Sequence, residues 1–417
     1  MKVNHKTFSG GYKFDTFEGQ PSKHVIKFSP KSDVADLAIK SGDHVSAADV
    51  LNALDLTNFN GPESALVATE GTIDPSKVTR IVISTVEVEP YDFPNDALLR
   101  EENKTRFIDG IKSIKASYTN AQISLVFDES QKDLVRMMAS ESDNLSWMES
   151  YTISAKYPAN LKELTLPTIF DVKYPVGYAP AHLGMLFLTV SDVLHVTRVV
   201  TENKDADYVT IALSGTGWKE NVLLEVPVGT IIKDLVKDYL TDDEVRLIKN
   251  SVITGDVLTT EDVITYDTRV IIALPEDRRR QTLFFLRAGL KADSFSNAFL
   301  SRLMPKADKT AETNLHGERR ACVSCTYCEN VCPVGLMPHL LHKHVDKEII
   351  NKRLAEYKIF DCIECGLCDY VCPSKIEISS DIKRGKELLE KEEISHNAYV
   401  IPQCDMILEP KEVAENE

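Results

Sequence analysis

The chain lacks cysteine over most of its length, because all nine cysteines of its 417 residues lie at or beyond Cys322. It also lacks the run of about 18 apolar residues that a membrane-spanning helix requires. The nearest candidate, His182 to Val196, is interrupted by Ser191, Asp192 and His195. The N-terminal residues MKVNHKTFSGGYKFDTF contain no apolar signal-peptide core. We therefore expect a cytoplasmic protein that reaches a membrane only by docking to a partner.

Positive charge is also scarce. The chain has 48 Lys and Arg residues against 64 Asp and Glu residues, which gives a formal net charge of −16. Broad binding to a nucleic-acid backbone needs a basic surface, so we expect no nucleic-acid partner. Hydrophobic residues make up 43% of the chain and charged residues 27%, as in ordinary globular proteins, which excludes wholesale disorder and a polytopic membrane protein.

Glycine-rich phosphate loops are missing as well. The chain has 18 glycines and neither a G-x-G-x-x-G nor a Walker sequence. The nearest match, Ser214-Gly215-Thr216-Gly217, follows an expected strand but continues towards another strand instead of a helix, so we predict a β-turn there. The sequence therefore gives no positive evidence for bound FMN or NAD.

The cysteines that are present form two copies of one pattern, C-x2-C-x2-C-x3-C-P. This pattern is the bacterial ferredoxin signature for 4Fe–4S clusters, in which the fourth cysteine binds the other cluster. The sequence thus predicts two 4Fe–4S clusters, which together relay single electrons. The first would be bound by Cys322, Cys325, Cys328 and Cys372, and the second by Cys362, Cys365, Cys368 and Cys332.

Other interpretations of these cysteines are weaker. Disulfides form in oxidising compartments, and the chain has no export signal. Structural zinc usually takes two ligand pairs, which leaves the third cysteine of each motif surplus. Buried free thiols would not repeat the spacing. Cys404 belongs to neither motif, and we predict that it is a free thiol.

Helical segments surround the motifs. Pro338 to Tyr357 carries apolar residues at near-helical spacing, and Ile376 to Glu393 is helix-like and rich in Lys and Glu. We therefore predict an α-helical cluster domain instead of a compact β-hairpin ferredoxin. His339, His342 and His344 lie on the first helix. Because the cysteines already complete both clusters, we predict solvated histidines on the helix face and no further metal site.

The whole chain predicts a multidomain α+β protein. Residues 1–80 contain short strands and turns, with a strand–turn–strand over Val34 to Val50, and resemble the flattened barrel-sandwich β domain of biotinyl and lipoyl carriers without a carrier lysine. Residues 81–195 alternate expected strands with expected helices, from Asn95 to Ala116 and from Leu134 to Ser142, which predicts a mostly parallel, Rossmann-like α/β domain. Residues 196–304 predict a mixed β-grasp (SLBB-like) sheet holding one helix. The α-helical dicluster ferredoxin domain takes 305–395, and 396–417 form an acidic tail.

Several stretches resemble two homologous subunits of known complexes. Phe8-Ser9-Gly10-Gly11, Glu87-Val88-Glu89-Pro90-Tyr91 and the region from Phe360 to Ser374 resemble the C subunit of the RNF complex, the membrane-bound ferredoxin:NAD oxidoreductase. Asn250-Ser251-Val252-Ile253-Thr254-Gly255 and Phe284-Phe285-Leu286-Arg287-Ala288-Gly289 resemble the A subunit of the sodium-pumping NADH:quinone reductase (NQR).

The resemblance implies a peripheral iron–sulfur electron-transfer subunit of an ion-pumping oxidoreductase, on the cytoplasmic side of the inner membrane. Its partners would be integral-membrane subunits and a protein electron donor or acceptor, such as a ferredoxin, a cytochrome or a flavoprotein. No catalytic residue is assigned, and whether the chain is itself an enzyme stays open.

Two departures from the relatives matter. The glycine-rich loop that supports FMN and NADH in the RNF subunit is absent, because Gly71-Thr72-Ile73 leads almost directly to Arg80. Although Lys173-Tyr174-Pro175-Val176-Gly177 resembles a further RNF stretch, no flavin residue is carried over. The quinone-reductase subunit normally lacks the cluster cysteines. Two alternatives stay open. The chain could be an FMN-containing NADH dehydrogenase subunit with a degenerate nucleotide-binding loop, or the clusters could have no redox role and only stabilise the helical domain.

Overall fold

The computed structural model describes most of the chain from the N-terminal strand to the last helix. The described residues are 3–14, 25–35, 39–41, 46–54, 74–99, 102–142, 145–172, 180–241, 244–276 and 319–394. Cys404, Lys173 to Gly177 and Phe284 to Gly289 lie outside these residues, so the predictions for them stay predictions.

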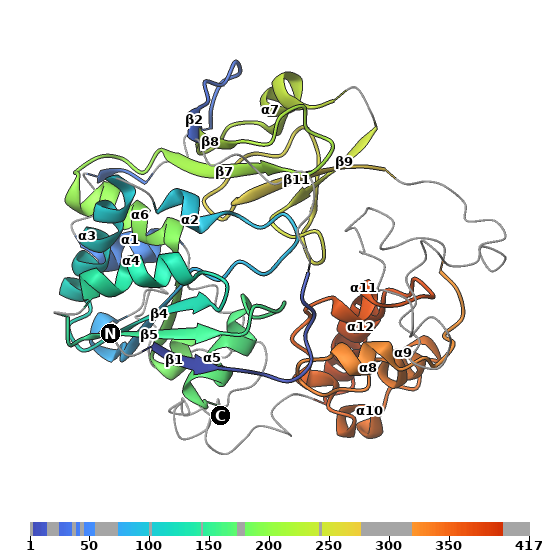
Figure 1. Ribbon diagram of the computed structural model, residues 1–417. Coiled ribbons are helices and arrows are strands. Elements are labelled where there is room, and N and C mark those ends of the chain that lie inside the picture. Colours follow the sequence, from blue (N-terminus) through green and yellow to red (C-terminus); the bar gives the residue numbers. More distant parts are fainter. Residues whose placement is uncertain are drawn as a thin grey trace, which may run out of the picture.

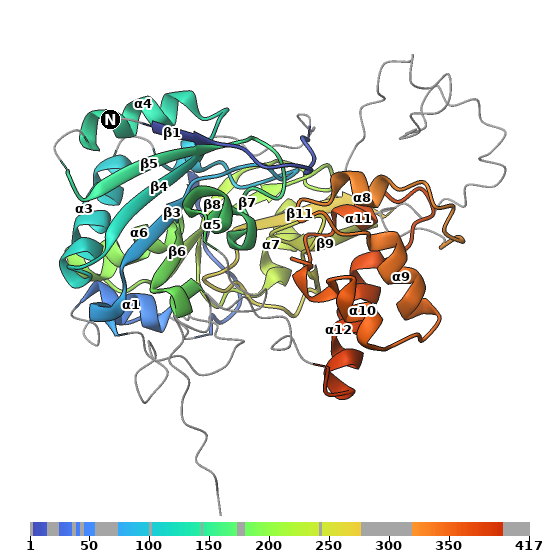
Figure 2. The same cartoon turned by 90° about the horizontal axis from the view of Figure 1, so that it is seen from below.

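The first sheet has five strands in the order β1-β5-β4-β3-β6, and all neighbouring strands are parallel (Figure 2). The predicted parallel sheet is therefore confirmed. Its central strands β3 and β4 are apolar runs that are buried on both faces, as parallel strands covered by helices are. The strands are β1 (Val3–Lys6), β3 (Arg80–Ser84), β4 (Gln122–Asp128), β5 (Met148–Ile153) and β6 (Met185–Thr189).

Helices follow the strands of this sheet. The single helix predicted from Asn95 to Ala116 is split into α2 and α3, and the predicted helix from Leu134 is present as α4. Strand β5 and helix α5 were not predicted, since β5 alternates polar with apolar residues. The helices are α2 (Asn95–Leu98), α3 (Glu102–Ser117), α4 (Lys132–Ser142), α5 (Lys162–Phe170) and α6 (Val190–Val196).

The second sheet has six strands in the order β10-β9-β11-β7-β8-β2, with parallel and antiparallel pairs, and lies beside helix α7 (Figure 1). The mixed sheet with one helix agrees with the prediction for this region, and Ser214 to Gly217 form the predicted turn between β7 and β8. The elements are β2 (Val25–Lys27), β7 (Tyr208–Ser214), β8 (Leu223–Pro227), α7 (Ile232–Tyr239), β9 (Val245–Lys249), β10 (Val257–Leu258) and β11 (Val270–Pro275).

The N-terminal region differs from its prediction. Strand β1 joins the first sheet and β2 the second. The second strand expected before Val50 is wrong, because Ala47–Ala53 form helix α1. The Ser46 hydroxyl accepts a hydrogen bond from the Asp49 N–H, and the Asp49 carboxylate accepts one from the Ser46 N–H. This capping box is a helix-start signal that the sequence contained. The barrel itself stays a prediction, since residues 55–73 lie outside the described part.

The C-terminal helical unit, defined as residues 319–394, is the α-helical region that the sequence predicted. It lies beside the first sheet and below the second (Figure 1). Within the described ranges, no helix combines the length and the apolar character needed to cross a membrane. The helices of the C-terminal helical unit are α8 (Tyr327–Val331), α9 (Pro338–Asp346), α10 (Lys352–Glu356), α11 (Leu367–Tyr370) and α12 (Ile378–Lys391).

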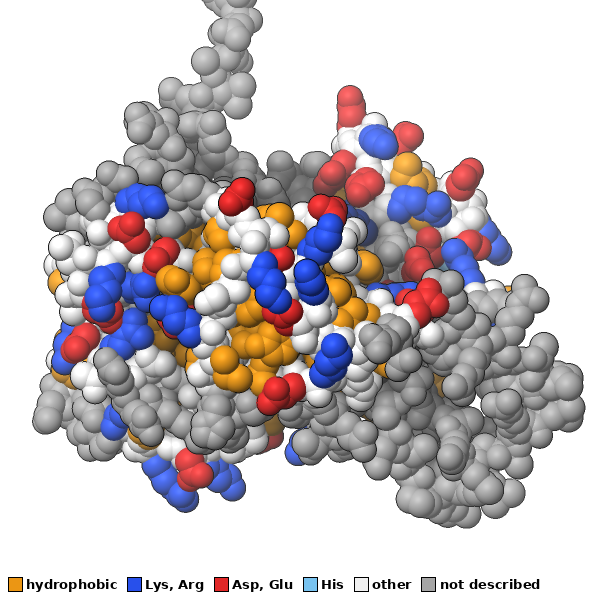
Figure 3. Space-filling model, turned by 90° about the horizontal axis from the view of Figure 1, so that it is seen from above, with side chains coloured by type: hydrophobic (Ala, Val, Ile, Leu, Met, Phe, Trp, Pro, Cys, Tyr) orange, Lys and Arg blue, Asp and Glu red, His pale blue; other side chains and the backbone are white. Residues whose placement is uncertain are grey.

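The surface near the second sheet is of mixed character. Seen from above, hydrophobic side chains gather in the middle of the described surface and are bordered by Lys, Arg, Asp and Glu (Figure 3). Val25 and Ile26 on the edge strand β2 are 44% and 41% exposed. Folded proteins expose much apolar area in this way, so the patch by itself marks no site.

Candidate metal centre

The two cysteine motifs follow the same backbone path. The second motif begins 40 residues after the first (362 − 322). In each motif the backbone enters the left-handed region at the same three positions. Turns of this kind point backbone N–H groups into a concavity that suits a negatively charged iron–sulfur group. The matching pairs are Ser324 and Glu364 (both φ 55°), Thr326 and Gly366 (φ 64° and 71°), and Gly335 and Lys375 (φ 69° and 51°).

The structure places the fourth cysteine of the second motif beside the first motif. Burial raises the pKa of the Cys372 thiol, and the nearby charges of Cys325 and Cys322 raise it further. Burial also raises the pKa of Cys328 to about 12, with Cys325 and Cys372 among the contributing charges. Cys372 therefore lies within electrostatic reach of all three cysteines of the first motif.

The reciprocal arrangement holds for Cys332. Burial raises the pKa of Cys362 to about 11 and that of Cys365 to about 12, and in both cases the charge of Cys332 contributes. Burial raises the pKa of Cys368 as well, and Cys362 and Cys365 are among its charged neighbours. This crossed proximity is what the predicted ligand sets need. The sets themselves stay a prediction.

Backbone N–H groups face the sulfur atoms. The N–H of Leu336 donates to the Cys332 sulfur at 3.3 Å. The N–H groups of His339 and Ile376 hydrogen-bond the sulfurs of Cys328 and Cys372 and lower their pKa values, against the larger effect of burial. Such bonds stabilise thiolates and tune the reduction potential of a cluster.

The donor set fits an iron–sulfur cluster better than a single ion. Desolvated thiols keep their protons unless a bound metal supplies positive charge, and a coordinating thiol is deprotonated outright. Within the described residues, no three His, Cys, Asp or Glu side chains are grouped closely enough to hold one metal ion. Because a cluster is larger than an ion, its thiolates stand further apart. Eight thiols in two repeated motifs, with backbone N–H groups facing the sulfur atoms, suit iron–sulfur clusters.

Comparison with known proteins supports this assignment. Residues 318–376 match the family described as 4Fe-4S dicluster domain. The A subunit of a Na(+)-translocating NADH-quinone reductase from Psychromonas ingrahamii is 26% identical over 60% of this chain and 61% of its own length. The C subunit of an ion-translocating oxidoreductase complex from Buchnera aphidicola is 21% identical over 76% of this chain and 60% of its own length. The chain is a homologue of both proteins and carries a 4Fe–4S dicluster domain.

The homologous subunits are longer than the part that this chain matches, since the chain spans about three fifths of their length. Among solved structures, a NAD+-reducing NiFe hydrogenase in the H2-reduced state is 13% identical, covers 94% of this chain and 68% of its own, and has a TM-score of 0.44. A similarity at this level carries no argument about function.

The prediction of solvated histidines is wrong for His342, which is buried, and His339 and His344 are half-buried. His342 is 3% exposed, and its Nδ1 lies 2.7 Å from the Asp381 carboxylate. Arg319 lies 3.5 Å from the same carboxylate. The side chain of His339 is only 12% exposed, and His344 Nδ1 hydrogen-bonds the Leu340 carbonyl at 2.9 Å. The helical spacing correctly predicted that all three histidines lie on α9. The packing of α12 against α9, which buries part of this face, could not be predicted from the spacing.

The two motifs differ in exposure. Val323, which follows the first cysteine of the first motif, is 68% exposed, whereas the equivalent Ile363 is 7% exposed. Ile363, Cys365 and Leu367 belong to the apolar core on one face of the first sheet. The loop after β9 covers Gly366, because a Cβ atom there would lie 2.7 Å from the Ile253 side chain. The first motif therefore faces solvent, and the second faces the body of the chain.

The N-terminal segment ties the dicluster domain to the first sheet (Figure 1). The Gly11 N–H donates to the Val331 carbonyl at 2.9 Å, and Tyr12 and Tyr157 exchange two backbone hydrogen bonds. Gly10 has a φ of 67°, and a Cβ atom there would lie 2.7 Å from the Cys332 carbonyl oxygen. The stretch Phe8 to Gly11, noted for its resemblance to the RNF subunit, thus packs directly on a cluster cysteine.

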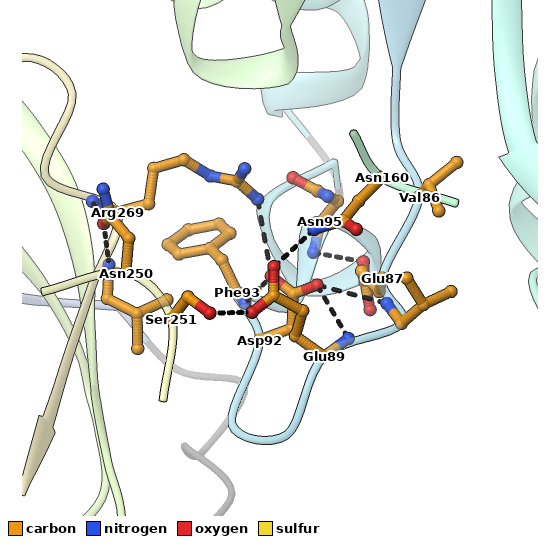
Figure 4. Close-up of polar contacts among 12 residues, drawn as sticks. Val86, Glu87, Glu89, Asp92, Phe93, Asn95, Asn160, Asn250, Ser251 and Arg269 are labelled. Atoms are coloured by element: carbon orange, nitrogen blue, oxygen red, sulfur yellow. Dashed lines mark hydrogen bonds and ion pairs between the residues drawn. The ribbon is translucent and has the colours of Figure 1, made fainter. Parts of the chain in front are cut away.

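A polar junction joins residues that follow β3 of the first sheet to residues after β9 and before β11 of the second sheet (Figure 4). The Glu89 carboxylate accepts hydrogen bonds from the Ser251 hydroxyl and, at 2.5 Å, from the Asn160 amide. Asp92 accepts the N–H of Phe93 at 2.8 Å and lies 3.6 Å from the Arg269 guanidinium. The stretches around Glu89 and Ser251 are two of those that resemble the known subunits, and the fold brings them into contact.

The junction favours protonated carboxyl groups. The pKa of Glu89 is raised to about 7, because burial and the nearby charge of Asp92 raise it more than the hydrogen bonds from Ser251 and Asn160 lower it. Burial raises the pKa of Asp92, which Arg269 partly offsets. Burial also raises the pKa of Glu87 well above its usual range. The Asp92 side chain keeps 14% of its area exposed, so its desolvation is large but incomplete.

Sequence reasoning missed two residues of this junction. Tyr157 is fully buried, and its hydroxyl donates to the Cys365 carbonyl at 2.7 Å. Arg269 precedes β11 and supplies the cation facing Asp92. Neither stands in a motif. The signal for Tyr157 was weak, a Lys-Tyr-Pro-Ala-Asn turn after an unrecognised strand.

The Tyr157 hydroxyl provides a test of this contact. We expect Tyr157→Phe to cost about 1 kcal/mol, because the buried Cys365 carbonyl loses a hydrogen bond. The reduction potential of one cluster should shift while that of the other stays constant, as measured by EPR-monitored redox titration. Equal shifts of both potentials would contradict a local effect at the second motif. Tyr327→Phe, which removes the hydroxyl of the residue beside Cys328 in the first motif, is the matched control.

Proposed function

We propose that the chain is a peripheral iron–sulfur electron-transfer subunit of an ion-translocating membrane complex of the RNF or NQR type. The supporting observation is that the fourth cysteine of each motif lies near the other motif's cysteines, in a homologue of two subunits of such complexes. The clusters, when bound, pass single electrons. The proposed ligands are Cys322, Cys325, Cys328 and Cys372 for the first cluster, and Cys362, Cys365, Cys368 and Cys332 for the second.

The residues around the motifs would have different tasks. The exposed loop at Val323 is the side from which a protein electron donor or acceptor can approach the first cluster. At the second motif, the chain itself excludes water through Ile253 and Tyr157. The proposed location is the cytoplasmic side of the inner membrane, with integral-membrane subunits as partners. The domain division at 80, 195, 304 and 395 belongs to the same proposal.

An anaerobic titration tests the function. The purified, cluster-loaded protein is treated first with NADH and then with dithionite, and visible absorption and EPR are followed. We expect no bleaching by NADH, with or without added FMN, and full reversible reduction by dithionite. Reduction by NADH alone would favour the alternative, an FMN-containing NADH dehydrogenase subunit. Clusters that dithionite cannot reduce reversibly would leave only a structural role.

A further inference from the structure

The junction contains more negative than positive groups. Glu87, Glu89, Asp92 and Asp128 lie together at the ends of β3 and β4, and Asp96 adds its charge from the start of α2. The Glu87 N–H donates to Asp128 at 3.2 Å, and the N–H groups of Asn95 and Asp96 donate to Glu87. Among the described side chains, Arg269 supplies the positive charge that acts on Glu89 and Asp92. The same guanidinium also acts on Asp192, so its charge is divided among three carboxyl groups.

Glu89 is connected to the second motif by two routes. Its partner Ser251 begins the loop whose Ile253 and Thr254 pack on Gly366, between Cys365 and Cys368. The second route is Tyr157, whose hydroxyl donates to the Cys365 carbonyl and which lies close enough to Glu89 to feel its charge. Glu89 does not contact a cysteine in any described interaction. The buried Tyr157 ring, 0% exposed, therefore stands between Glu89 and the second motif and leaves electrostatic interaction as the link between them.

An electron that arrives at the second motif adds one negative charge to an already acidic region. Charges interact strongly where water is largely excluded, because the effective dielectric constant is low. The extra charge destabilises the ionised form of a neighbouring carboxyl group and favours its protonated form. Glu89 is suited to this role since hydrogen bonds from Ser251 and Asn160 stabilise its ionised form while burial opposes it, so the two forms are close in free energy. The residual exposure of the Asp92 side chain, at 14%, provides contact with solvent protons.

We propose that Glu89 binds one proton when the cluster held by the second motif accepts an electron, and releases it when the electron leaves. The inference rests on the proposed function. The balance is one electron from the protein donor and one proton from water, with the Glu89 carboxylate becoming a carboxylic acid and no covalent bond to carbon changing. The net charge of the region is thereby the same before and after electron arrival, which makes the second cluster easier to reduce at lower pH.

The test is a redox titration of the full-length, cluster-loaded protein over a pH series, with EPR reporting each cluster. In the wild type, the potential of the second cluster should fall with rising pH near neutrality, by up to about 59 mV for each tenfold decrease in proton concentration. The potential of the first cluster should change much less. In Glu89→Gln the slope of the second cluster should vanish, because the amide cannot take up a proton.

A matched control separates proton uptake from a simple change of charge. Glu387 lies on α12, is exposed and directly follows Lys386, whose ammonium donates to the Cys362 carbonyl at 2.7 Å. Glu387→Gln removes a negative charge from the surroundings of the same cluster and should leave the slope as in the wild type. A slope that survives in Glu89→Gln, or a wild-type potential that is independent of pH, would overturn the inference.

A second variant keeps the inference testable if Glu89→Gln fails to hold its clusters. Ser251→Ala removes the hydroxyl that donates to Glu89 and leaves the carboxyl group in place. The slope should persist, but the pH range over which it occurs should move upward, because the ionised form loses a hydrogen bond. If the pH range were the same as in the wild type, Glu89 would not be the group that takes up the proton. Clusters that cannot be reduced reversibly in the wild type would instead refute the proposed function.

Discussion

Replacing Cys372 by Ser is expected to damage the cluster of the first motif, although Cys372 belongs to the second. The thiol of Cys372 has Cys322 and Cys325 as charged neighbours, and Cys328 in turn has Cys372 among its neighbours. A serine hydroxyl is a poor ligand for iron in a site built from thiolates. The variant should lose about half of its iron, since each predicted set of four cysteines holds one of two clusters. Iron content and EPR measure the loss.

The controls for this prediction are other cysteine-to-serine changes. Cys328→Ser should damage the same cluster as Cys372→Ser, whereas Cys332→Ser should damage the other one. Cys404→Ser, outside both motifs, should retain all the iron. If Cys372→Ser removed the EPR signal that depends on Cys362, Cys365 and Cys368, the crossed assignment would be wrong.

Gly10→Ala is expected to loosen the N-terminal segment from the dicluster domain. The residue has a φ of 67°, and its new Cβ atom would lie 2.7 Å from the Cys332 carbonyl oxygen, which is backbone and cannot rotate away. The left-handed conformation costs about 1–2 kcal/mol for a residue with a Cβ atom, and overpacking adds about 1–3 kcal/mol. Thermal unfolding followed by circular dichroism and iron release should both shift to lower temperature.

Gly335→Ala is the matched control. Gly335 has a φ of 69°, but a Cβ atom there would meet no other atom within 4 Å. Gly335→Ala therefore has the free-energy cost of the left-handed conformation but no steric overlap of the new Cβ atom with a neighbouring atom. The difference between the two variants measures the packing of Gly10 on Cys332, and equal stabilities would show that this contact is unimportant.

The parallel sheet could be predicted because its central strands are short apolar runs separated by helical periods. Strand β5 could not be predicted, because polar and apolar residues alternate along it. Its outer neighbour β1 comes from residues 3–6, far away in sequence. Helix α1 was missed although Ser46 and Asp49 form a capping box, because the turn residues before it favoured a hairpin. His342 illustrates the same limit, since only the packing of α9 on α12 places Asp381 beside it.

The iron–sulfur chemistry followed from the order of the amino acids alone. Ligand type and spacing are local properties, and two copies of C-x2-C-x2-C-x3-C-P indicate the cluster type and predict the exchange of the fourth cysteine. The surroundings of each motif, in contrast, became visible only in the folded chain. The exposure of Val323 against the burial of Ile363, the packing of Gly10 on Cys332, and the meeting of Glu89, Ser251 and Arg269 all join residues from separate parts of the chain. Contacts of this kind depend on how sheets and helices pack together, which the local spacing of residues does not encode.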